Sequence, residues 1–122
     1  MKIPIFTIDA FSPGAFGGNP AAVCLLKEDI PDDLKQKIAM EMNLSETAFI
    51  LPLDGTSSLA NPFQDGKDFE LRWFTPTTEV PLCGHATLAS AATLFYTQNN
   101  KKVNTIFRSA FRTLLFHIAK ST

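Results

Sequence analysis

The segment from Gly84 to Tyr96 constrains the fold most, because it is apolar on nearly every side. It contains small residues such as alanine and serine and no Asp, Glu, Lys or Arg. A helix of this composition is expected to be enclosed by other structure rather than to lie on a surface. The chain has 122 residues, which is enough for one modest domain. The sequence therefore predicts at most one domain, with this helix as the hub of its core.

Four stretches outside the central helix have the composition of β-strands, namely residues 3–11, 21–26, 47–52 and 69–75. The second is a continuous apolar run, as in a strand buried on both faces, and the fourth alternates apolar and charged residues. Residues 54–67 are rich in Gly, Ser, Asn and Asp, which favours a long exposed hairpin loop. The order of elements predicts an α+β fold in which a mixed sheet curls around the central helix.

A second helix is predicted to begin with Pro31-Asp32-Asp33 and to stop at Asn43. Its first turn is acidic, as is typical of a helix N-terminus. A helical spacing places Leu34, Ile38 and Met42 toward the core and leaves for solvent Lys35, Lys37 and Glu41.

Glu46 stands at the junction of this helix and the next predicted strand, flanked by Ser45 and Thr47. A partly desolvated carboxylate in such a position can both accept and donate a proton near neutral pH. The alternative is a capping residue or a solvated loop acid, which is the commoner role of acidic residues. Glu46 is therefore a candidate general acid/base.

The start of the central helix is the second candidate site. Backbone N–H groups and the helix dipole favour an anion there, and Gly84 allows a ligand close to the backbone. A substrate carboxylate would fit. His85 adds a hydrogen bond or a proton relay, or is simply a structural donor. Cys83 is either an activated thiol or a small residue packed under the helix.

Other candidates are weaker. Cys24 lies in an apolar strand and is expected in the core, while Arg72 either binds an anion or is a solvated or salt-bridged residue on the exposed face of its strand. No glycine-rich phosphate loop and no metal-spaced set of His and Cys is present, so neither a metal, a cofactor nor a nucleic-acid partner is predicted. No apolar run reaches the ~18 residues of a membrane span, and no signal peptide is recognisable, so we expect a cytoplasmic protein with reduced thiols.

Three motifs together resemble the phenazine-biosynthesis-like (PhzF-type) isomerase family. They are Gly18-Asn19-Pro20-Ala21-Ala22-Val23, Glu41-Met42-Asn43-Leu44-Ser45-Glu46-Thr47-Ala48-Phe49, and the segment 72–89, which contains Cys83-Gly84-His85-Ala86-Thr87. The resemblance covers about residues 1–100. It implies a diaminopimelate-epimerase-like fold of two similar halves, each a sheet around a helix, with the active site between them. Residues 1–100 then form the amino-terminal half.

The same resemblance implies roles for individual residues. Glu46 matches the family's general acid/base, and Gly84 and His85 match its substrate-binding pair. The implied activity is cofactor-independent, isomerase-type proton transfer on a small carboxylate-bearing metabolite. Cys83 falls where related epimerases hold a catalytic thiol, but many PhzF-type members lack one, so no catalytic role is assigned to it.

Residues 101–122 depart from the family pattern. All twelve acidic residues precede residue 80, whereas five of the eleven basic residues lie from Lys101 onward. Apolar residues recur at steps of three and four, which predicts a basic amphipathic helix; they are Ile106, Phe107, Ala110, Phe111, Leu114, Leu115 and Ile118. This tail is an unrelated end, a cover over the cleft face, or a contact with a membrane surface or partner.

Two functional hypotheses follow, and the sequence leaves open whether the chain is an enzyme. In the first, proton transfer by Glu46 is retained by the chain or by a homodimer, which exposed apolar surface would favour. In the alternative, the chain is a truncated, catalytically inactive half-domain that binds small ligands or modulates a full-length relative.

Overall fold

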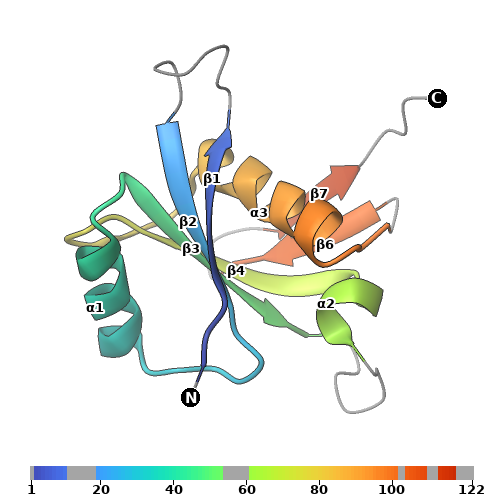
Figure 1. Ribbon diagram of the computed structural model, residues 1–122, viewed down its shortest axis with the longest axis horizontal. Coiled ribbons are helices and arrows are strands. Elements are labelled where there is room, and N and C mark those ends of the chain that lie inside the picture. The colour runs from blue at the N-terminus through green and yellow to red at the C-terminus, as the bar shows by residue number, and fades with distance from the viewer. Residues whose placement is uncertain (1, 11–18, 54–60, 102–103, 110–112, 118–122) are drawn as a thin grey trace.

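The computed structural model describes residues 2–10, 19–53, 61–101, 104–109 and 113–117. These residues form a seven-stranded mixed sheet with helices on both faces (Figure 1). The strands are β1 (Ile5–Ala10), β2 (Asn19–Leu25), β3 (Glu46–Pro52), β4 (Asp68–Phe74), β5 (Glu79–Val80), β6 (Asn104–Arg108) and β7 (Thr113–His117). Their order is β1-β2-β3-β4-β6-β7, and β5 pairs with β4. The pairs β2–β3 and β4–β6 are parallel and the others antiparallel, so the predicted mixed sheet is confirmed.

The two faces of the sheet are covered by different helices. Side chains alternate along a strand, and in β3 Ala48 and Ile50 join one apolar cluster while Phe49 joins the other. The first cluster contains residues of α3 (Gly84–Thr97), and the second contains Ala39 of α1 (Asp32–Met42). Alternation therefore divides the residues of β3 between an α3 face and an α1 face.

Helix α3 is the predicted central helix, and its buried half faces the sheet. Half of its fourteen residues are buried, namely Ala86, Thr87, Ala89, Ser90, Ala91, Thr93 and Leu94. Small residues let the helix lie close to β1, β2 and β3, which it contacts. The helix is not enclosed all round, since Tyr96 is 79% exposed.

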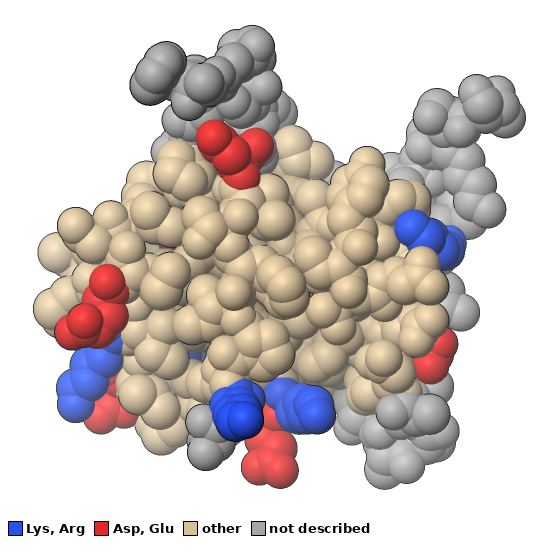
Figure 2. All heavy atoms as spheres, viewed as in Figure 1, with Lys and Arg blue, Asp and Glu red and all other residues tan. Residues whose placement is uncertain are grey.

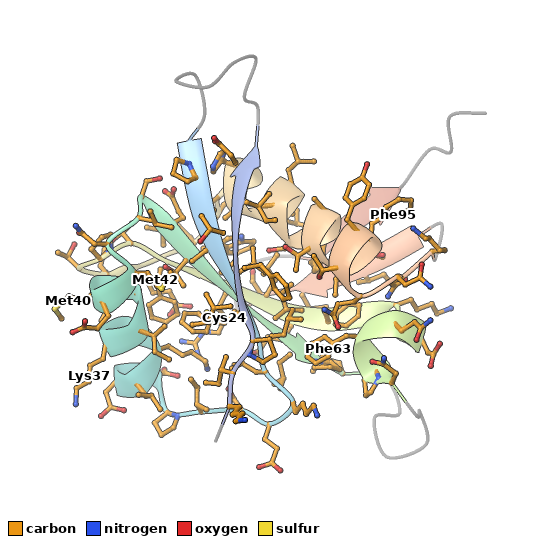
Figure 3. All side chains as sticks on the ribbon, in the orientation of Figure 1. Cys24, Lys37, Met40, Met42, Phe63 and Phe95 are labelled. Carbon is orange, nitrogen blue, oxygen red and sulfur yellow. The ribbon has the colours of Figure 1, made fainter. Side chains whose placement is uncertain are left out.

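Helix α1 ends as predicted but faces the sheet differently. Asn43 adopts a left-handed conformation with φ of 52°, and its N–H donates to the Ala39 carbonyl at 3.1 Å. The expected assignment of faces is wrong at two positions, because Lys35 is fully buried and Leu34 is 36% exposed. Lys37 points away from the sheet as expected (Figure 3). The buried face is rotated by one residue relative to the apolar spacing.

The predicted loop over residues 54–67 contains a helix near its end. Residues 54–60 lie outside the described part, and α2 (Pro62–Asp65) follows. Phe63 is buried and stacks on Phe69 of β4 with ring centroids 6.4 Å apart. The amide of Asn100 donates to the carbonyls of Phe63 and Gly66 at 2.9 and 2.8 Å. These contacts fix α2 against the sheet, so a wholly exposed loop is the wrong description of this segment.

The helix predicted over the tail is not formed, because residues 104–108 and 113–117 are strands β6 and β7. Phe107 pairs with Phe69 of β4 and is 1% exposed, and Leu114, opposite Phe107, packs against the same cluster. Two short apolar strands in succession produced the three- and four-residue spacing. Ala110, Phe111 and Ile118 lie outside the described residues.

Candidate functional site

Glu46 is the first residue of β3 and faces α3. It pairs with Ala21 of β2 and is half-buried. By alternation it shares a face with Ala48 and Ile50, both of which lie in the cluster beneath α3. The parallel pairing of β2 with β3 thus places the Glu46 carboxylate at the end of the sheet where α3 begins.

The first turn of α3 is capped by Cys83. Its Sγ accepts a hydrogen bond from the Ala86 N–H at 3.4 Å, and its carbonyl accepts one from the Thr87 N–H at 3.0 Å. Gly84 is exposed, and a Cβ placed on it would meet no atom of the described structure within 4 Å. His85 is half-buried. The described residues thus leave the Gly84 side of this helix start open to a ligand.

Glu46 perturbs the titration of the Cys83 thiol. Burial raises the pKa of the Cys83 thiol, and the charge of Glu46 and a hydrogen bond with its side chain raise it further, while the backbone N–H groups of Ala86 and His85 lower it. The thiol is therefore protonated at neutral pH and can donate to the carboxylate. Folding thus places Glu46, which is distant in sequence, beside the segment Cys83-Gly84-His85.

Sequence reasoning missed a buried pair next to this site. The indole Nε1 of Trp73 donates to the Thr87 hydroxyl at 3.1 Å, and that hydroxyl donates to the Cys83 carbonyl at 2.7 Å. Trp73 and Thr87 are 1% and 4% exposed. The alternation of apolar and charged residues in β4 indicates that Trp73 faces the core, but no local sequence pattern indicates that Thr87 is its hydrogen-bond partner.

Two other candidates are structural. Cys24 is fully buried, as expected, and burial raises its pKa to about 12. Arg72 forms the salt bridges that the sequence offered as one alternative, with Nη1 2.7 Å from Asp32 and Nε 2.7 Å from Glu79. Both cysteines are free thiols.

The described part of the chain holds no cluster of three or more His, Cys, Asp or Glu that could bind a metal ion. Within the same residues, none of the helices combines the length and hydropathy that crossing a bilayer requires. Figure 2 shows the charged side chains around the margin of that view, with uncharged residues at its centre over β1 and α3.

Comparison with known proteins gives consistent results. The family model for phenazine biosynthesis-like proteins matches residues 8–119, a range that includes β6 and β7. The human phenazine biosynthesis-like domain-containing protein is 61% identical over 100 residues, which are 82% of this chain and 33% of that protein. An uncharacterized isomerase of Halalkalibacterium halodurans is 55% identical over 95 residues, 78% of this chain and 31% of that protein. This chain thus spans about a third of the length of these relatives.

A solved structure supports the fold. The crystal structure of a PhzF-family phenazine biosynthesis protein from Enterococcus faecalis superposes with a TM-score of 0.81 at 39% identity, over 98% of this chain and 42% of that one. The expected α+β, diaminopimelate-epimerase-like architecture is therefore confirmed. By motif, family model and fold, this chain belongs to the phenazine biosynthesis-like (PhzF) family.

Proposed function

We propose that the chain carries the amino-terminal part of a cofactor-independent isomerase site that moves a proton on a small carboxylate-bearing metabolite. In this proposal Glu46 is the general acid/base, and Gly84 and His85 bind the substrate carboxylate at the start of α3. The observation that carries it is the placement of the half-buried Glu46 beside the Cys83 cap of an open helix N-terminus. A proton-transfer group and an anion-binding position are then adjacent, as substrate isomerisation requires.

The chemistry follows from the neighbours of Glu46. A substrate carboxylate at the helix start would be held by backbone N–H groups, so that the adjacent carbon lies within reach of Glu46. The Glu46 carboxylate would take a proton from one carbon of the substrate and return it to another. The protonated Cys83 thiol would donate to Glu46 and keep its reactive oxygen oriented.

Deuterium incorporation from D2O into candidate substrates tests the proposal. Glu46→Gln should lower the exchange rate by about 10²–10⁴-fold, because the amide cannot accept the proton. Glu70→Gln is the matched control, since Glu70 is also a half-buried acid on a strand but lies on the face away from α3. Equal exchange by wild type and Glu46→Gln would refute the role of Glu46.

A substrate-free measurement checks the geometry. Because Glu46 raises the pKa of Cys83, Glu46→Gln should lower that pKa and speed alkylation of Cys83 at neutral pH. Glu70→Gln should leave alkylation unchanged.

A second candidate function is binding of small carboxylates without turnover. It is favoured by the open Gly84 side, where a Cβ would meet no atom of the described residues within 4 Å. A ligand there would stay in contact with water, which weakens electrostatic stabilisation of a transition state. Carboxylate binding without any Glu46-dependent exchange would establish this alternative.

A further inference from the structure

Thr87 joins the sheet to the first turn of α3. Its hydroxyl accepts the indole N–H of Trp73 at 3.1 Å and donates to the carbonyl of Cys83 at 2.7 Å. Both side chains are almost fully buried, at 4% and 1% exposure. Because water does not compete at such positions, each donor depends on its protein partner.

Other hydroxyls on α3 make only part of this arrangement. Ser90 donates to the Ala86 carbonyl at 2.7 Å and Thr93 to the Ala89 carbonyl at 2.8 Å, the usual bond to the preceding helical turn. Thr87 makes the same kind of bond but also receives the Trp73 N–H from β4. Its bond to the helix is therefore tied to the sheet.

The strand ladder connects Trp73 to Glu46. Trp73 of β4 pairs with Ala48 of β3, two residues beyond Glu46. From Trp73 the hydrogen bonds run through Thr87 to the Cys83 carbonyl, and the Cys83 thiol is within range of the charge of Glu46. Trp73 is thus connected to Glu46 in two ways, through Ala48 in the sheet and through Thr87 and Cys83 at the start of α3.

We propose that Thr87 is a positioning residue of the candidate site, which holds the first turn of α3, and with it Cys83, in a fixed place beside Glu46. The proposal deepens the proposed function and rests on it for its catalytic consequence. Removing the hydroxyl would leave the Trp73 N–H without its partner and free the Cys83 carbonyl from the sheet. Cys83 would then no longer be held in a fixed position relative to Glu46.

The test compares Thr87→Val with Thr93→Val, since valine keeps the shape of threonine without its hydroxyl. Thr93 is the matched control because it is fully buried and loses the same bond to the preceding turn. Alkylation of Cys83 by iodoacetamide is followed against pH, by peptide mass spectrometry that separates Cys83 from Cys24.

In Thr87→Val, release of Cys83 from its half-buried place should speed alkylation at neutral pH by about threefold to tenfold, with the profile moving toward that of an ordinary thiol. Thr93→Val and Thr87→Ser should follow the wild type, since serine keeps the hydroxyl. The emission spectrum of Trp73, the sole tryptophan, should change in Thr87→Val alone.

Trp73→Phe provides a second approach should Thr87→Val not fold, because it removes the indole N–H and leaves the Thr87 hydroxyl. It should speed alkylation of Cys83 in the same direction. An unchanged Cys83 profile in a folded Thr87→Val, or in Trp73→Phe if Thr87→Val does not fold, would overturn the proposal. So would an equal change in Thr93→Val.

The catalytic consequence is measured separately. Where the wild type shows Glu46-dependent exchange, Thr87→Val should lower its rate at saturating substrate by about tenfold or more, with a smaller change in KM. Absence of exchange in the wild type would refute the proposed function and leave the alkylation comparison to decide whether Thr87 positions Cys83.

Discussion

At the scale of single residues, Lys35 lies on the buried face of α1 although it carries a charge. Its side chain is 1% exposed, and its Nζ lies 2.8 Å from Asp29 and 3.6 Å from Asp32. Asp29 is 55% exposed, so the pair joins a buried cation to a hydrated anion. The aliphatic stem of Lys35 packs in the core while its ammonium reaches Asp29, which precedes α1, and Asp32 in the first turn of α1.

Loss of Asp29 should therefore cost more than loss of Lys35. Asp29→Asn leaves an ammonium buried with weaker compensation, and we expect a fall in unfolding free energy of about 1–2 kcal/mol. Lys35→Met keeps an apolar stem and leaves Asp29 to water, so its cost should be below about 1 kcal/mol. Urea denaturation measures both, with the exposed Glu28→Gln as control. A larger loss in Lys35→Met would contradict this account.

At the scale of elements, Arg72 connects α1 to two strands. From β4 it reaches Asp32 in the first turn of α1 and both carboxylate oxygens of Glu79 in β5, and it lies over the Phe74 ring. The Gln36 amide adds a bond from α1 to the Thr75 carbonyl at 3.0 Å. Polar contacts thus hold α1 on a face whose apolar cluster is the smaller of the two.

This contact should depend on acid pH. Hydrogen bonding and charge from Arg72 lower the pKa of Asp32 below its ordinary 3.8. Such a group contributes stability above 3.8 that is lost as the pH falls through its lower folded value. The stability of wild type should thus fall more steeply than that of Arg72→Gln below this pH, by a small amount because Asp32 is 72% exposed. Thermal denaturation of both proteins between neutral and acid pH measures this difference. If the stabilities of wild type and Arg72→Gln fell in parallel, the contact between Asp32 and Arg72 would make no such contribution.

Local composition was enough to predict the elements that depend on nearby residues. The central helix, predicted from Gly84, and the stop at Asn43 follow from small apolar residues and from a residue that tolerates a left-handed conformation. Strand β6 could not be predicted in this way, because it pairs with β4 only after the chain has crossed over α3. The candidate residues were found from motifs, whereas the bond between Trp73 and Thr87 depends on side-chain directions that no motif carries.

At the scale of the whole molecule, residues 104–117 are built into the core over their described part. Strand β6 adds to β4, and Phe107 lies 6.2 Å from Phe69, ring centroid to ring centroid. Arg108 pairs with Asp68 across the same two strands at 2.8 Å. One positive charge of the tail, that of Arg108, is thus paired with an acid of the preceding sheet.

Phe107→Ala should consequently destabilise the whole fold. Truncation of a fully buried aromatic side chain costs about 3–5 kcal/mol, a large part of the stability of a small domain. Ile106→Ala is the neighbouring control, since Ile106 is half-buried on the opposite face and should cost less. Chemical denaturation followed by circular dichroism measures both; equal and small losses would mean that β6 is peripheral.

The late position of α3 in the sequence also delays one step of folding during synthesis. β1 and β2 form a hairpin, and isolated hairpins form in about 1–10 μs. The helix that covers Val23 of this hairpin begins at Gly84, about sixty residues later in the chain, and at ~5–20 residues per second a ribosome needs about 3–12 seconds to add them. Throughout that interval the apolar face beneath α3 has no cover, so the nascent chain offers chaperones a hydrophobic surface that the finished protein conceals.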